Sequence, residues 1–245
     1  MADRSPKNDG TRTEATAAGA GNSLLDSASS GGLRFFGRIS ASISHELKNT
    51  LSIMNESAGL IEDLALLAER GKALDASRVK NLGATIKRQI QRTDQIIRNM
   101  NRFSHTVDEP FKEIELVDFL EFILTVSRRL TVAKGVTVAL HARDQPIMVV
   151  TRPFFLHGLM WRLLEFGMQW AGTSKALTVM PDKRGSGIVV RLEGMETIVP
   201  DAGRDFPAPP DLALLALLEA QVRIDFEEKA MILGMPQRIG SGLPG

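Results

Sequence analysis

Three residues in the first third of the chain, His45, Glu46 and Asn49, have side chains suited to phosphoryl chemistry. They lie in the string Ile-Ser-His-Glu-Leu-Lys-Asn-Thr-Leu, residues 43–51, whose apolar steps of three and four predict an α-helix. At 100° per residue, His45 lies about 160° from the apolar stripe, so we expect its imidazole to face solvent. An exposed, neutral imidazole is a competent nucleophile toward phosphorus. Glu46 can accept or orient the ring proton, and Asn49 can hold a phosphoryl oxygen or an attacking water.

Two long amphipathic helices are expected to position these residues. The first begins at Leu33 and runs for about 35 residues along a single apolar stripe. Gly71 interrupts it, Asp75 or Ser77 can cap a second helix, and the second stripe is relieved only by Thr93. One hairpin leaves both stripes partly bare, so we expect two copies to form a dimeric four-helix bundle, making the protein a homodimer.

Mixed helix and strand signals after Pro110 predict a second domain, an α/β sandwich, so the fold class of the whole chain is α+β. Residues 1–30 are rich in small polar residues and are expected to form a disordered tail. The helical hairpin takes residues 31–108, the sandwich takes 109–238, and 239–245 form a flexible tail. The sandwich is expected to contain helices near 116–130, 153–170 and 212–220, and strands near 135–140, 147–150, 176–180, 188–192, 222–226 and 230–235.

Composition excludes several classes of function. The chain has 30 Lys and Arg against 29 Asp and Glu, a formal net charge of +1, so we expect no nucleic-acid partner and no anionic membrane partner. It contains no cysteine, which removes disulfides and thiolate metal sites, and we see no metal framework. No apolar window approaches the roughly 20 residues needed to cross a bilayer, and the polar start is unlike a signal peptide. We therefore expect a cytoplasmic protein.

The string Ser-His-Glu-Leu-Lys-Asn-x-Leu, residues 44–51, resembles the H-box of two-component sensor histidine kinases, in their dimerisation and phosphotransfer domain. The resemblance implies that His45 carries phosphate, that Glu46 assists, that Asn49 supports dephosphorylation, and that the partner is a response-regulator receiver domain. The resemblance to histidine kinases also includes residues 96–104 and 115–120. It continues more weakly to about residue 236. Thr50 departs from it, because most H-boxes have proline there, and the helix bend is expected to be weaker.

The second half departs further from an ATP-binding histidine kinase. Arg162 and Phe166 stand where the family has asparagines, one of which ligates magnesium. In the turn that should read Asp-x-Gly-x-Gly, Glu193 takes the acidic position while Met195 and Thr197 replace both glycines.

The segment that should form a glycine-rich lid, residues 200–210, contains Gly203 alone. We therefore expect a degenerate ATPase-like domain that uses no cofactor, neither ATP nor magnesium. Shifting the alignment by one residue would place Glu165 in the helix site as a carboxylate ligand, which keeps a kinase reading open.

These features favour a phosphorelay protein similar to the dimeric histidine phosphotransferases, acting as a phosphotransferase or phosphatase. Two alternatives stay open: an active sensor histidine kinase with a divergent ATP site, and a non-catalytic module that binds a receiver domain or forms mixed dimers with a true histidine kinase. The remaining histidines, at 105, 141 and 157, lack a comparable context and are interpreted as structural.

Overall fold

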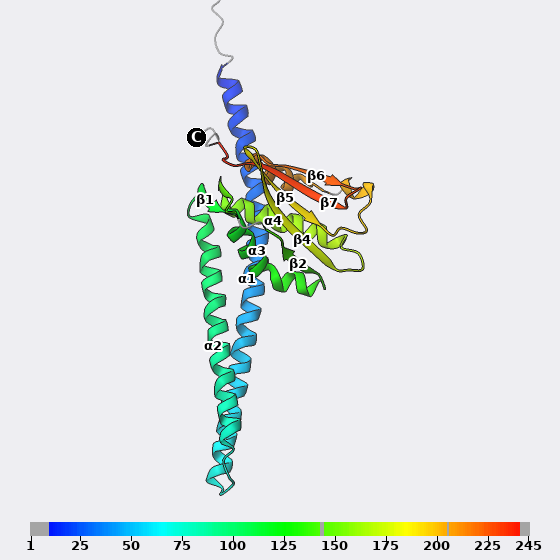
Figure 1. Cartoon of the computed structure of the whole chain (residues 1–245). Coiled ribbons are helices and arrows are strands. Elements are labelled where there is room, and N and C mark those ends of the chain that lie inside the picture. Colours follow the sequence, from blue (N-terminus) through cyan, green and yellow to red (C-terminus); the bar gives the residue numbers. More distant parts are fainter. Residues whose placement is uncertain (1–9, 143–144, 205, 241–245) are drawn as a thin grey trace, which may run out of the picture. The chain divides into compact units, whose positions relative to one another are not determined.

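The computed structural model describes residues 10–142, 145–204 and 206–240, with side chains described from residue 26 onward (Figure 1). It divides into two compact units. The hairpin unit holds residues 37–108, and the sheet unit holds the described residues before 37 and after 108.

The hairpin unit consists of parts of two long helices, α1 (Gly10–Glu69) and α2 (Ala76–Ser104), followed by one short turn, η1 (His105–Val107). Gly71 follows α1 with φ of 81°, a left-handed conformation that glycine adopts without strain. Asp75 caps α2, since its carboxylate accepts a hydrogen bond of 3.0 Å from the backbone N–H of Arg78. The sequence-based expectation of a break at Gly71 and a restart at Asp75 is confirmed.

Helix α1 is much longer than the sequence indicated, because residues 10–30 belong to it rather than to a disordered tail. Within this stretch Ala28 is fully buried. Close packing continues at Gly32, where a Cβ would lie only 2.5 Å from Cε1 of Phe154. Tertiary contact within the sheet unit thus supports the helix around residues 28–32, where its small residues give little periodic signal. Residues 1–9 of the expected tail lie outside the described residues.

The sheet unit contains one mixed five-stranded sheet in the order β2-β4-β5-β7-β6, in which β2 and β4 are parallel and the other neighbours antiparallel. A separate antiparallel pair joins β1 to β3. The helices are α3 (Leu116–Ala133), α4 (Pro153–Gln169) and α5 (Pro209–Leu217), with a short turn η2 (Pro200–Arg204). The strands are β1 (Lys112–Glu115), β2 (Thr137–Leu140), β3 (Met148–Thr151), β4 (Ala176–Arg184), β5 (Gly187–Glu193), β6 (Gln221–Asp225) and β7 (Ala230–Pro236).

The expected helix-and-strand sequence is confirmed, with two differences. Strand β1 was not expected, and it exists because it pairs along its length with β3. Residue 239 does not begin a flexible tail, because Ile239 is buried and its N–H donates a hydrogen bond of 3.0 Å to the carbonyl of Val150. Residues 241–245 lie outside the described part.

The core of the sheet unit lies between the helices and the inner face of the sheet. Strands β4 and β5 alternate buried and partly exposed residues, as expected for a sheet with one face covered. Helix α4 approaches closely at Gly167, where a Cβ would lie 2.7 Å from Cδ2 of Leu192. On α4, Trp161 stacks on Phe35 of α1 with ring centroids 5.7 Å apart.

No helix in the described part of the chain is long and apolar enough to span a bilayer.

Candidate functional site

His45 lies on an exposed face of α1, as its helical phase indicated. Asn49, one turn further along, is exposed as well. No hydrogen bond or ion pair joins His45 to any residue of the described part of the chain. Of the serines nearby, Ser42 is buried at 7% exposure, whereas Ser52 is exposed and donates to the carbonyl of Lys48 at 2.9 Å. The imidazole is therefore accessible to a partner.

Glu46, the acidic residue after His45, is held by the second helix of the hairpin. Nη2 and Nε of Arg92 donate hydrogen bonds to Oε1 of Glu46, at 2.8 and 3.3 Å. Both bonds end on the same oxygen, so Oε2 is left to accept a proton. The pair also ties the helix that carries His45 to α2.

Thr50, which stands where most H-boxes have proline, is fully buried. Its hydroxyl donates to the carbonyl of Leu47 at 2.8 Å and accepts a hydrogen bond of 2.9 Å from the hydroxyl of Thr93 on α2. Thr93, the polar interruption in the second apolar stripe, is thus the partner of Thr50. Helix α1 runs through this position without interruption, and a cross-helix hydrogen bond fixes the register one turn beyond Glu46.

In the sheet unit, Arg162 of α4 stands where the resemblance implies a magnesium-binding asparagine, and it forms an ionic cluster with Asp211 and Glu165. Nε and Nη2 of Arg162 donate to the two carboxylate oxygens of Asp211, at 2.7 and 3.1 Å, and Nη1 donates to Glu165 at 2.7 Å. Asp211 is fully buried, and its hydrogen bond raises the pKa of Arg162 above the usual range. Glu165, the alternative magnesium ligand, is therefore bound to a guanidinium.

Aromatic and aliphatic side chains fill the space beside this cluster. Phe166 of α4 stacks on Phe206 with ring centroids 4.8 Å apart and planes at 28°. Phe206 comes from the segment aligned with the nucleotide lid, and it is 2% exposed. Met195, which stands at the first glycine of the expected Asp-x-Gly-x-Gly turn, is fully buried. Phe206 of the lid-equivalent segment is thus packed into the apolar core.

The turn after β5 is fixed by the backbone and by one carboxylate. Gly194 has φ of 97°, and a Cβ there would lie 2.3 Å from the carbonyl oxygen of Ala176, so only glycine fits. Glu196 accepts hydrogen bonds from the N–H groups of Thr173 at 3.1 Å and Ser174 at 3.4 Å. Hydrogen bonds from Ser174 and Thr173 hold the pKa of the Glu196 carboxyl below its ordinary value. The carboxylate therefore pins the turn to the loop between α4 and β4.

The other sequence-level candidates are not brought together with these groups. Glu193, aligned with the acidic position of the turn, pairs with Arg191 on β5. His157 is buried at 1% exposure and stacks on Phe119 with centroids 4.1 Å apart. Among the described residues, no group of three or more His, Cys, Asp or Glu side chains could hold a metal ion.

Comparison with known proteins places this fold beside histidine kinases. No protein-family model matches the chain, and no curated protein matches it significantly. The nucleotide-free catalytic domain of histidine kinase ThkA is similar with a TM-score of 0.45 at 9% identity, covering 53% of this chain and 97% of that one. Acinetobacter baumannii histidine kinase AdeS gives 0.43 at 13%, covering 79% and 98%. ThkA in complex with response regulator TrrA gives 0.43 at 13%, covering 84% and 63%.

These likenesses are too distant to assign an activity. The chain does have the arrangement expected from its sequence, a helical hairpin followed by an α/β sandwich similar to the histidine kinase ATPase domain.

Sequence reasoning missed Arg92 and Asp211 as parts of these sites. Arg92 lies 46 residues from Glu46, and Asp211 lies 49 residues from Arg162. One signal was available for Asp211: an acidic residue in the first turn of a helix that begins with two prolines. Its carboxylate accepts from the N–H of Ala208 at 3.0 Å, so it also caps α5.

Proposed function

We propose that this protein is a two-component phosphorelay protein, which carries phosphate on His45 and exchanges it with a response-regulator receiver domain without using ATP. The observation that carries the proposal is the exposed imidazole of His45, with exposed Asn49 one turn away on a hairpin helix. Glu46 is fixed beside it by Arg92 with one carboxylate oxygen to spare.

The proposed transfer begins at the aspartyl phosphate of the receiver. A ring nitrogen of neutral His45 attacks phosphorus, the bond from phosphorus to the aspartate oxygen breaks, and a P–N bond forms. The other ring nitrogen then carries a proton that Glu46 can accept or orient through Oε2. In the hydrolytic branch, Asn49 positions a water that attacks phosphorus in place of the imidazole, releasing inorganic phosphate.

Two features of the sheet unit support the absence of a nucleotide step. The Arg162 guanidinium occupies the position of the magnesium-binding asparagine, and it is bonded to Asp211 and Glu165. Phe166, at the other asparagine position, stacks on Phe206 and makes the space beside α4 aromatic rather than polar. A magnesium–nucleotide complex would have to displace a buried ion pair and an aromatic stack.

The partners belong to the same proposal. ThkA has been solved with response regulator TrrA, which supports a receiver domain as the partner of this chain. Large apolar side chains of the hairpin stay exposed on one chain, including Leu51 at 57%, Ile90 at 54% and Ile97 at 46%. A second copy would cover them in a four-helix bundle. A cytoplasmic location goes with a receiver domain as partner.

The proposal is tested by screening the receiver domains of the source genome. Each receiver domain is phosphorylated with a small acyl phosphate and separated from the unreacted reagent. The phosphorylated receiver is then incubated with the full chain. At least one receiver is expected to lose its phosphate faster with the wild type than alone, and not with His45→Ala. If no receiver exchanges phosphate, yet one binds wild type and His45→Ala equally well, the protein is a non-catalytic binding module. Autophosphorylation of His45 from ATP would make it a kinase.

A further inference from the structure

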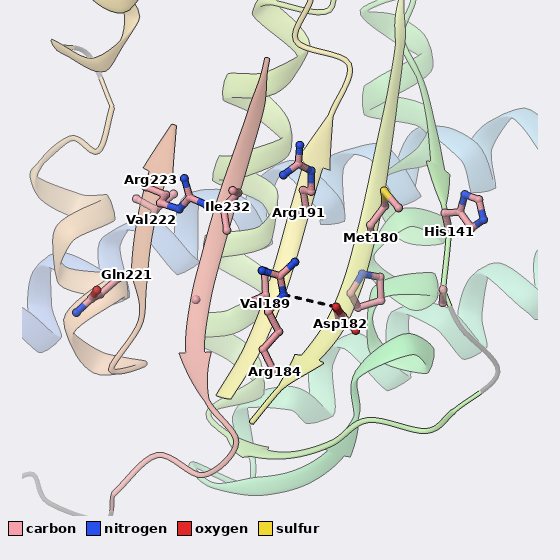
Figure 2. A pocket seen from close by; sticks show the side chains of 13 residues that line it. His141, Met180, Asp182, Arg184, Val189, Arg191, Gln221, Val222, Arg223 and Ile232 are labelled. Atoms are coloured by element: carbon pink, nitrogen blue, oxygen red, sulfur yellow. Dashed lines mark ion pairs between the residues drawn. The ribbon is translucent and has the colours of Figure 1, made fainter. Parts of the chain in front are cut away.

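The outer face of the five-stranded sheet, opposite the helices, is hollowed rather than flat (Figure 2). The hollow has a volume of about 610 Å³ and lies wholly in the sheet unit. Strand register sets two rows of side chains across it. One row is Met180, Arg191, Ile232 and Arg223, and the next is Asp182, Val189, Gly234 and Gln221.

Gly234 accounts for the depth of the hollow. It lies in the middle of β7 between Val189 and Gln221, and a Cβ added to it would meet nothing nearer than the Gln221 carbonyl oxygen at 4.0 Å. Its φ is not positive, so the backbone does not require glycine there. The missing side chain therefore provides space, above a floor formed partly by Met180, Val189 and Ile232.

The rim of the hollow is basic, and two of its guanidiniums are only loosely paired. Arg184 lies 3.6 Å from Asp182 with 70% of its side chain exposed, and Arg223 lies 3.4 Å from Asp225 with 65% exposed. Arg191, in contrast, is 24% exposed and held by Glu193 and Glu228. Arg184 and Arg223 thus retain donors for an incoming anion, while Arg191 is fixed in place.

We propose that this hollow binds a small amphipathic organic anion. Its apolar body lies over Val189, Ile232 and the open space at Gly234, and its acidic group pairs with an exposed guanidinium at either end of the hollow, that of Arg184 or that of Arg223. The volume falls within the range of about 300–1,000 Å³ typical of small-molecule sites, and an apolar floor with few polar groups is their usual lining. The site is separate from the Arg162 cluster, which lies on the helix side, and it does not depend on phosphate transfer by His45.

Anilinonaphthalene sulfonate is a suitable probe, because it combines an aromatic body with one fixed negative charge and fluoresces when shielded from water. Titrated into the full-length protein, it is expected to saturate at one molecule per chain. The neutral analogue phenylnaphthylamine is expected to bind about tenfold more weakly, since it lacks the acidic group.

Variants place the probe in the hollow. Gly234→Leu fills the space and is expected to abolish saturable binding, whereas Thr178→Leu, on the same face outside the hollow, leaves it unchanged. The double variant Arg184→Gln, Arg223→Gln is expected to weaken binding about tenfold and to reduce its salt dependence. If Gly234→Leu does not fold, Val189→Asp tests the same point by placing a like charge on the floor. Absence of saturation, equal binding of the neutral analogue, or unchanged binding in these variants would overturn the proposal.

Discussion

At the scale of single residues, the hairpin presents an exposed histidine next to a carboxylate that is held in place. His45 is accessible and makes no bond to the described residues, while Glu46 is anchored by Arg92 across the hairpin. The exposure of His45 and Asn49 was predictable, because helical phase depends only on local spacing. The Arg92 contact was not, since it depends on how two helices pair 46 residues apart.

Asn49 is expected to act in hydrolysis rather than in transfer. Asn49→Ala should leave phosphate transfer between receiver and His45 intact, while slowing release of inorganic phosphate by about ten- to a hundredfold, because a positioned water is lost. Rates of phosphate release and of label transfer, measured side by side, check this. Asn55→Ala, which removes another exposed asparagine of α1, is the matched control. Equal loss of transfer and hydrolysis would assign Asn49 to binding instead.

Glu115 offers a pH test of a helix cap in the sheet unit. Partial burial raises the pKa of its carboxyl, but hydrogen bonds from the N–H groups of Asp118, Ile147 and Val117 outweigh this, so the pKa is lowered on folding. A lowered folded-state pKa gives stability that is present above the unfolded-state pKa, about 4.3, and is lost as pH falls through the folded-state value.

Glu115→Ala is therefore expected to reduce the free energy of unfolding by about 1 kcal/mol at neutral pH, and by less in acid. Urea titrations followed by tryptophan fluorescence report on this unit, because Trp161 and Trp170 both lie in it. Glu113→Ala, at an exposed position of the same strand, provides the control. A loss of stability that is the same at acid and neutral pH would exclude the carboxylate as its cause.

Helices and strands could be predicted where neighbouring residues in the sequence determine them. The spacing of apolar residues and the capping residues predicted the break at Gly71 and a second helix capped by Asp75 or Ser77, of which Asp75 is the cap. The N-terminal part of α1 was not predicted, because its small polar residues show no apolar period. Strand β1 was not predicted because four residues are too few to show a strand period, and it forms by pairing with β3.

Association of the hairpin is best tested at an apolar residue that is exposed in one chain. Ile97 is 46% exposed, whereas Ile43 is already buried in one chain, so its replacement would disturb folding. Ile97→Asp is expected to weaken the dimer by several kcal/mol, because a carboxylate would be buried without a partner. Sedimentation velocity over a concentration series measures this, with exposed Asn101→Asp as control. A wild type that stays monomeric at all concentrations would refute the dimer.

The Arg162 cluster makes a testable claim about α4. Arg162→Asn introduces the residue type that the resemblance to histidine kinases leads one to expect at this position. It is expected to destabilise the sheet unit by about 2–3 kcal/mol, because it leaves the buried Asp211 carboxylate short of donors. ATP with magnesium should bind neither wild type nor variant at sub-millimolar concentration in calorimetric titration. Arg128→Asn, at an exposed position of α3, controls for loss of charge. Nucleotide binding by the wild type would contradict the closed site.

The molecule as a whole combines a hairpin with an exposed histidine and a sheet unit in which polar and aromatic contacts surround α4. The resemblance to histidine kinases singled out Arg162, Phe166 and Met195 from the sequence. Their contacts could not be predicted, because the partner of Arg162 is 49 residues away and Phe206 reaches α4 from a separate segment. The hollow around Gly234 was equally hidden, since it depends on strand register.

Direct transfer of labelled phosphate tests the central claim most sharply. A cognate receiver carrying radiolabelled phosphate, free of ATP, is mixed with the full chain, and the chain is recovered and tested for acid-labile, alkali-stable label. The account predicts label on His45 in the wild type, none in His45→Ala, and no dependence on added nucleotide. A receiver that binds wild type and His45→Ala equally, without moving phosphate to either chain or to water, would contradict it.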